Sequence, residues 1–229
     1  MLSLVRVLIR PWSEVERIRS KPEWLIPFII LAIAHVAVVT ATQHSSVLMT
    51  LRHLPPGATI QDKIAVEQLL YDTFGARIAF LPFRLLTGWL AFAITLFTLC
   101  KVWKTSQSVR LAHIIALEIH AEVSLLFGSI GAAVLVIFNR SNILSAVLKV
   151  PFGLDAFFSS PDDVVLLTFL NSFNLFSAWY VVILTAGIHA FYQISLTKSL
   201  VTALAGYGFT ALFQAATMFA LRDAFHFNI

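Results

Sequence analysis

The sequence contains few charged residues and almost no cysteine. Only 12% of its 229 residues are Asp, Glu, Lys or Arg, against about 25% in an ordinary soluble domain. The single cysteine, Cys100, cannot form an internal disulfide, and its position at the end of an apolar run predicts a small buried side chain. These features exclude a disulfide-stabilised domain and disfavour thiol chemistry.

Motifs of common enzymes are also missing. The sequence contains no glycine-flanked serine nucleophile, no zinc-binding His-Glu-x-x-His and no glycine-rich phosphate loop. The net charge is +4, but the basic residues are dispersed and flank apolar runs, whereas a nucleic-acid-binding face gathers them in a stripe. We therefore expect no enzyme, no cofactor, no metal and no nucleic-acid partner.

What the sequence does contain is apolar side chain in excess. Hydrophobic residues make up 59% of the chain and the mean hydropathy is +0.85, a surplus that has to face lipid. A helix needs about 20 apolar residues to cross the hydrocarbon core. We predict an all-α, polytopic integral membrane protein with one domain over residues 24–229. Its five predicted spans are residues 24–42, 80–100, 114–138, 168–192 and 199–221, the last two forming an antiparallel hairpin.

Lysine and arginine counts predict the orientation of these spans. Nine of these residues lie in residues 1–23, in the connection after the second span and in the one after the fourth, whereas six lie in the longer stretches on the other side. Positive residues favour the cytoplasmic side. We expect an inner-membrane protein with its N-terminus in the cytoplasm and its C-terminus outside.

Residues 1–23 have a character of their own. Ser13 and Glu16 match a helix capping box, and Val15 and Ile18 lie one helical turn apart before Pro22. We expect a short amphipathic helix lying on the cytoplasmic leaflet; the alternative is a solvated basic tail. The predicted interfacial anchors are Trp12, Trp24, Arg17 and Arg19. A second surface helix, with a packing role, is expected within residues 55–79.

The order of these features resembles the Yip1 domain family of five-span membrane proteins, its bacterial members in particular. The matching residues near the start are Pro11-Trp12, Val15, Ile18, Pro22-Glu23-Trp24 and Pro27; those near the end are Phe173-Asn174-Leu175-Phe176-Ser177-Ala178-Trp179 and Gly187. This resemblance implies a fold and a membrane location. It implies no reaction.

Ionisable residues at membrane depth are costly unless they are paired or wetted. At ~1.5 Å per residue, Glu118 lies roughly 9 Å into the third span and Glu122 roughly 15 Å, while His35 lies roughly 16 Å into the first. His35 and Glu122 are therefore level, and we predict a hydrogen-bonded pair. Arg84 lies near the outer end of the second span and is expected to snorkel outward.

The candidate intramembrane polar cluster comprises His35, Glu118, His120, Glu122 and His189. On a helix Glu118 and Glu122 share a face, whereas His120 points about 200° away. A structural pair, a proton or ion pathway, and a two-carboxylate metal site completed by a histidine are the alternatives. We expect a non-enzymatic membrane component that organises lipid, membrane-protein partners or a homo-oligomer; the alternative is a small transporter or channel subunit with a polar third helix.

Overall fold

Every regular element of the described chain is a helix. The computed structural model describes residues 2–52, 54, 57–103, 108–138, 153 and 164–224. Its helices are α1 (Leu2–Ile9), α2 (Pro11–Ser20), α3 (Leu25–Arg52), α4 (Ile60–Asp72), α5 (Phe74–Lys101), α6 (Leu111–Phe138), α8 (Val164–Asn171), α9 (Leu175–Tyr192) and α10 (Leu196–Ala224).

Four of the described helices are long and apolar enough to cross a membrane. These segments are Leu25–Leu48, Phe74–Lys101, Leu111–Ile137 and Leu175–Tyr192. The predicted all-helical class is confirmed, and the apolar helices agree with a membrane protein. The first three segments are longer than the predicted spans because the first continues past its predicted end and the other two begin before their predicted starts.

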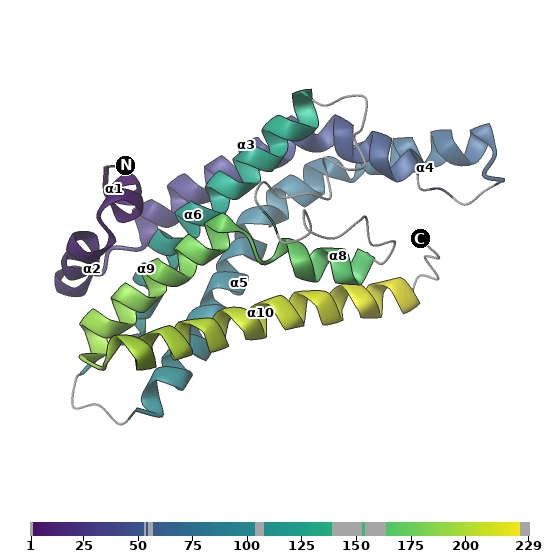
Figure 1. Cartoon of the computed structure of the whole chain (residues 1–229). Helices are drawn as coiled ribbons and strands as arrows, with labels where there is room; N and C mark the ends of the chain where they lie inside the picture. Colours follow the sequence, from purple (N-terminus) through teal and green to yellow (C-terminus); the bar gives the residue numbers. More distant parts are fainter. Residues whose placement is uncertain are drawn as a thin grey trace.

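The long helices run together, with α8 beside α10 and the other short helices at opposite ends of the molecule (Figure 1). α1 and α2 lie at one end, together with the start of α3, and α4 lies at the other. We call these the α1–α2 end and the α4 end. α9 and α10 form a hairpin whose turn includes Gln193 in the left-handed conformation (φ 54°).

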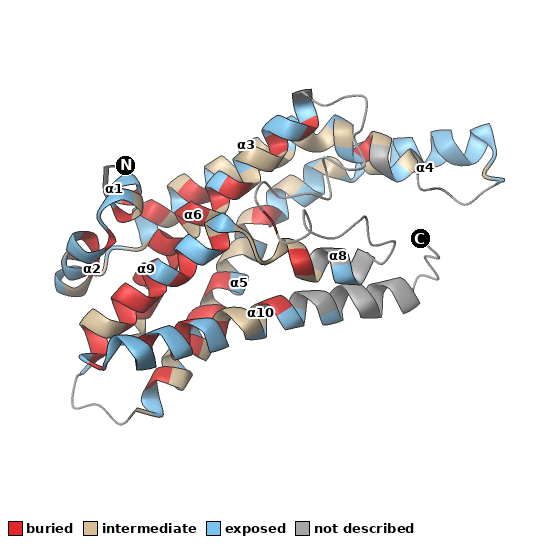
Figure 2. Ribbon diagram, viewed as in Figure 1, coloured by how far each residue is buried: buried red, intermediate tan, exposed pale blue. Residues whose placement is uncertain are grey.

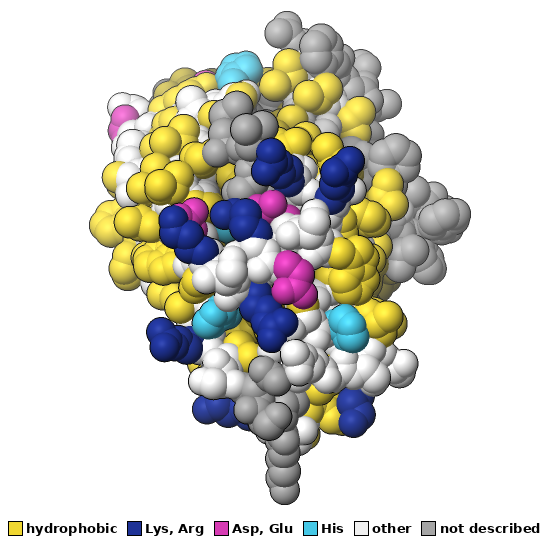
Figure 3. All heavy atoms as spheres, turned by 90° about the vertical axis from the view of Figure 1, so that its left-hand side faces the viewer, with side chains coloured by type: hydrophobic (Ala, Val, Ile, Leu, Met, Phe, Trp, Pro, Cys, Tyr) yellow, Lys and Arg dark blue, Asp and Glu magenta, His cyan; other side chains and the backbone are white. Residues whose placement is uncertain are grey.

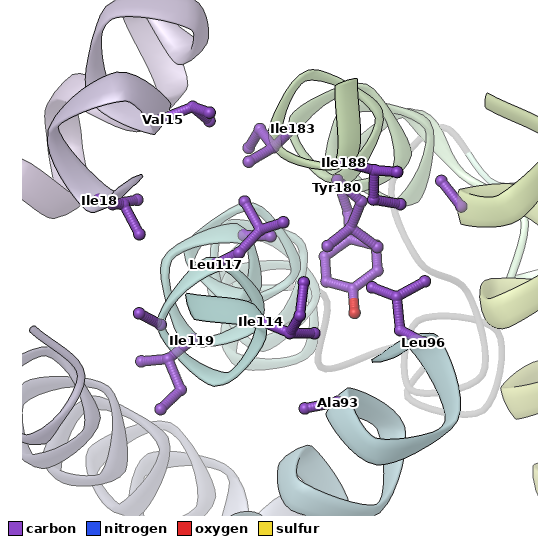
Figure 4. Packing of buried hydrophobic residues seen from close by; sticks show 14 of the residues in the cluster. Val15, Ile18, Ala93, Leu96, Ile114, Leu117, Ile119, Tyr180, Ile183 and Ile188 are labelled. Atoms are coloured by element: carbon purple, nitrogen blue, oxygen red, sulfur yellow. The ribbon is translucent and has the colours of Figure 1, made fainter. Parts of the chain in front are cut away.

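The core is centred on α6 and α9 toward the α1–α2 end. Figure 2 shows buried residues concentrated there, whereas α4 is largely exposed. Leu117, Ile183 and Leu184 are fully buried, and apolar side chains from α2, α5, α6 and α9 pack against one another (Figure 4). Gly187 lets α6 approach α9 closely, because a Cβ built there would lie 2.2 Å from Leu117 Cδ2.

The N-terminal segment is helical, but not as expected. α2 begins at Pro11 with Arg10 as its N-cap and has no side-chain cap, so the predicted capping box at Ser13 is wrong. Proline suits this first helical position because it has no N–H to satisfy. Val15 and Ile18 are fully buried within the protein core. The apolar turn expected to face lipid therefore faces α6 and α9.

The predicted fourth span is wrong at its start. α8 ends at Asn171, and α9 begins only at Leu175. Asn174 is the N-cap: its side chain accepts from the Ser177 backbone, and the Ser177 hydroxyl accepts from the Asn174 N–H. This capping box begins a new helix, so the apolar run is divided between α8 and α9.

α4 confirms the expected second surface helix. Its N-cap is Thr59, which forms a capping box with Asp62. Hydrogen bonds from the Thr59 hydroxyl and backbone N–H lower the pKa of the Asp62 carboxyl. None of its residues is buried, and it contacts α3 and α5, so its packing role stays a prediction. Lys104, Arg140 and Lys149, which entered the charge count, lie outside the described residues.

Candidate functional site

The candidate site is a set of polar side chains where α3, α5, α6 and α9 meet. Glu118 and Glu122 lie one turn apart on α6 and project from the same face. His35 comes from α3, Trp89 from α5 and Tyr180 from α9. Each side chain is carried by an otherwise apolar helix, so the helix packing alone brings the polar groups together.

His35 and Glu122 face each other across the α3–α6 contact. His35 Nε2 lies 3.8 Å from Glu122 Oε1, which is longer than a hydrogen bond. The pair is therefore level, as the depth count predicted, but is in ion-pair rather than hydrogen-bond range. On the other side of the ring, His35 Nδ1 lies 2.9 Å from the Leu31 carbonyl oxygen. The Trp89 side chain interacts with Glu122, and its ring meets the His35 ring edge-on at 6.0 Å between centroids.

Glu118 has a different partner. The Tyr180 hydroxyl donates to Glu118 Oε2 at 2.5 Å, joining α6 to α9. Glu118 is 2% exposed, so this bond gives the buried carboxyl group a partner within the protein. The Tyr180 ring also lies against Tyr207 of α10, with centroids 5.7 Å apart, and the Tyr207 hydroxyl donates to the Ser172 carbonyl oxygen.

His120 and His189 do not join this set. His120 Nδ1 lies 2.7 Å from the Ala116 carbonyl oxygen, and the side chain interacts electrostatically with Arg17 and Glu14 of α2. His189 lies in the last turn of α9, where Nδ1 contacts the Ile194 carbonyl oxygen at 2.5 Å. That position is nine residues beyond Tyr180, or roughly 13 Å along the helix.

The four proposed interfacial anchors differ in how far they are exposed and in what they contact. Trp12 is 49% exposed and its ring touches that of His189, whereas Trp24 packs against the core. Arg17 Nε binds Glu14 Oε1 at 2.5 Å, and Arg19 lies 3.7 Å from Glu16. Trp12 is therefore the anchor with the most surface available to a membrane.

A cavity of about 360 Å³ lies on the α4 side of the His35–Glu122 pair. α3 lines it with Val38, Thr42 and Ser46, which follow His35 by three, seven and eleven residues and so share its face. α6 and the start of α9 supply the remaining wall: Leu125, Gly128, Ser129, Ala132, Ala133, Val136, Asn174 and Phe176. Hydroxyl groups thus continue the polar line from His35 toward the α4 end.

Sequence reasoning found His35, Glu118 and Glu122 but missed their aromatic partners. Trp89 and Tyr180 lie in apolar runs where aromatic residues are common, so nothing local marks them. The spacing of Thr42 and Ser46 from His35 was a usable signal for the cavity wall. Within the part of the chain that the structure describes, no group of three or more His, Cys, Asp or Glu residues could hold a metal ion.

The described part of the chain is an all-helical bundle with four helices long and apolar enough to cross a membrane, and a carboxylate–histidine–aromatic cluster lies between α3, α5, α6 and α9. Comparisons with protein-family models, curated proteins and solved structures yield no match to this chain.

Proposed function

We propose that this chain is a non-enzymatic, multi-pass membrane protein of Yip1-like type that organises membrane partners or lipid. The observation that carries the proposal is that polar side chains inside the bundle form hydrogen bonds between helices. Tyr180 donates to Glu118 across α9 and α6, and the Trp103 indole N–H donates to Thr202 across the α5–α10 contact at 2.8 Å. Polar side chains used in this way hold transmembrane helices together.

The proposed topology has five spans, with α10 as the fifth. α10 is 29 residues long, roughly 43 Å at ~1.5 Å per residue, and packs against α5, α8 and α9. Figure 3 shows Lys and Arg side chains gathered over the α1–α2 end, ringed by hydrophobic surface. Positive residues favour the cytoplasmic side, which supports an inner-membrane address with the α1–α2 end in the cytoplasm and the C-terminus outside.

The N-terminal helices also fit a cytoplasmic interface. Their inward face is occupied by Val15 and Ile18, but Val5, Ile9 and Trp12 remain exposed at 45%, 71% and 49%. Apolar residues next to basic ones are typical of a surface that rests on a membrane. We propose that α1 and α2 contact the cytoplasmic leaflet through this outer face while packing on the bundle with the other.

Co-purification from native membranes tests the organising role. The chain is extracted in a mild detergent, and bound proteins and lipids are identified by mass spectrometry. Stoichiometric partners or a self-associated form retained by wild type are expected. A monomer carrying only bulk lipid composition contradicts the proposal.

A small transporter or channel subunit is the second candidate. It is favoured by the cavity, which ends one turn from the His35–Glu122 pair. Proton or cation flux in proteoliposomes separates the two functions: flux abolished by Glu122→Gln supports transport, whereas no flux from a folded protein supports the organising role. Glu118→Gln is the matched control, because Glu118 faces Tyr180 rather than the cavity.

A further inference from the structure

We propose that the His35–Glu122 pair is a proton-binding site reached by water from the α4 end only, through the cavity between α3, α6 and α9. The inference goes beyond the organising function and does not depend on it. It rests on the hydrogen-bonding roles of the His35 ring, on the position of the cavity and on the packing of the opposite half of the bundle.

The His35 ring shows that the pair holds a proton. The Leu31 carbonyl can only accept a hydrogen bond, so the His35 Nδ1 atom 2.9 Å away carries a hydrogen. In a neutral ring Nε2 then presents a lone pair, and it lies 3.8 Å from Glu122 Oε1. A lone pair facing an ionised carboxylate is repulsive, so a proton on either Nε2 or Glu122 is needed between them. Adding or removing that proton changes the charge of the pair as a unit.

The other charged and titratable groups around the pair do not replace this proton. Glu118 lies one turn away on α6 and bonds to Tyr180 of α9. Arg84 of α5 is exposed and interacts with His35 only electrostatically. Tyr207 of α10 interacts with Glu122 in the same way and donates its hydroxyl hydrogen to the Ser172 carbonyl.

The cavity supplies a route for water on one side of the pair. Its walls carry the hydroxyls of Thr42, Ser46 and Ser129 and the amide of Asn174. About 360 Å³ is room for several water molecules, and polar groups in the wall give them partners. Leu125, the lining residue nearest to Glu122 on α6, lies three residues beyond it, so the hollow begins roughly one turn from the pair and continues toward Ser129, roughly two turns away.

The other side of the pair is packed. Toward the α1–α2 end, Leu31 is 1% exposed and Ile114 and Leu117 are fully buried. Figure 4 shows apolar side chains of α2, α5, α6 and α9 pointing toward one another in this half. The same helices are therefore hollow on one side of the pair, with Val38 and Leu125 as the lining residues nearest to it, and close-packed on the other. In this proposal protons pass between the cavity and the pair at Val38 and Leu125.

Trp89 provides the measurement, because its side chain interacts with Glu122 and its ring lies against that of His35. Trp89 emission is taken as the difference between wild type and Trp89→Phe in lipid nanodiscs, between about pH 4 and pH 9, a range that spans ordinary carboxyl and imidazole titration. A titration is expected that disappears in Glu122→Gln, moves by about one pH unit or more in His35→Gln, and persists in Glu118→Gln. No titration in wild type, or an unchanged one in Glu122→Gln and His35→Gln, overturns the proton site.

Cysteine accessibility tests the one-sided route. In a Cys100→Ala background, Thr42→Cys lies on the cavity wall, and Leu31→Cys lies on the same face of α3 in the packed half. We expect a membrane-impermeant thiol reagent applied from the α4 side to label Thr42→Cys at least tenfold faster than Leu31→Cys, and neither to be labelled from the α1–α2 side. Equal labelling of the two, or no labelling of Thr42→Cys, overturns the route. Co-purification of partners from native membranes is a separate measurement, so the organising function and the proton site can fail independently.

Discussion

Gly187 is the position where one added methyl group should disturb the bundle most. A Cβ built there lies 2.2 Å from Leu117 Cδ2 and 2.4 Å from Leu117 Cδ1, well inside normal van der Waals contact. Leu117 is fully buried, so it has no space into which it can turn. Overpacking of this kind costs about 1–3 kcal/mol, and we expect Gly187→Ala to destabilise the protein by that amount.

The partner residue makes the test specific. Leu117→Ala alone leaves a cavity and should cost about 2–5 kcal/mol. In the double variant the new methyl group enters part of that cavity, so the two costs should fall short of their sum by about 0.5–3 kcal/mol. Gly88→Ala is the control, because Gly88 is exposed and a Cβ added there has nothing within 4 Å. This substitution should raise the free energy of unfolding by about 0.5–1 kcal/mol, because alanine favours a helix over glycine.

Unfolding by SDS in detergent micelles, followed by circular dichroism, measures these differences. The reasoning is refuted if Gly187→Ala is as stable as Gly88→Ala, or if the Gly187→Ala and Leu117→Ala costs simply add. Either result would mean that α6 and α9 are not in direct contact at this level.

Three further predictions follow from contacts between helices and from the cap of α4. Tyr180→Phe removes the donor to Glu118 and should lower the free energy of unfolding by about 1–3 kcal/mol. Glu118→Gln should lower it much less in the Tyr180→Phe background than in wild type. SDS unfolding of wild type, the two single variants and the double variant measures both effects. Trp103→Phe removes the indole donor to Thr202 and should cost about 1 kcal/mol, after which Thr202→Val should add little; a full additional cost would contradict the bond. The lowered pKa of Asp62 means that its cap contributes above the ordinary carboxyl pKa and is lost as pH falls through the folded-state value. The protection factors of the α4 amides, which correct for the intrinsic pH dependence of exchange, should therefore fall in acid in wild type but not in Asp62→Asn, and identical pH profiles of the protection factors would refute this.

Depth along a helix could be predicted from the sequence, whereas rotation about its axis could not. Counting residues from the start of each span placed His35 and Glu122 at one level, because the rise per residue is constant. Their proximity then required only that α3 and α6 be neighbours. The Tyr180–Glu118 bond needed the facing sides of α6 and α9 as well, and these are set by close packing at Gly187, which involves residues 70 positions apart in sequence.

Charge-free windows located the spans but not the helix ends within them. The window that predicted residues 168–192 contains no charge, so it could not show that α8 ends at Asn171 and α9 begins at Leu175. The local signal was Asn174 followed three residues later by Ser177, a polar pair that caps a helix. At the N-terminus the reverse occurred: Ser13 and Glu16 matched a capping box, but Pro11 began the helix first.

The two carboxyl groups of α6 show how one turn of helix can separate a structural role from a chemical one. Burying a carboxyl group in a membrane protein is costly, and each of these has a different way of meeting that cost. Glu118 is enclosed with a tyrosine hydroxyl at 2.5 Å, an arrangement that favours one fixed state and joins two helices. Glu122 faces an imidazole at 3.8 Å beside a cavity whose wall carries several hydroxyl groups, where we propose that a proton is exchanged. Glu122 lies at the boundary between the packed and the hollow halves of the bundle. This position, more than its burial, is why we propose that Glu122 and not Glu118 gains and loses a proton.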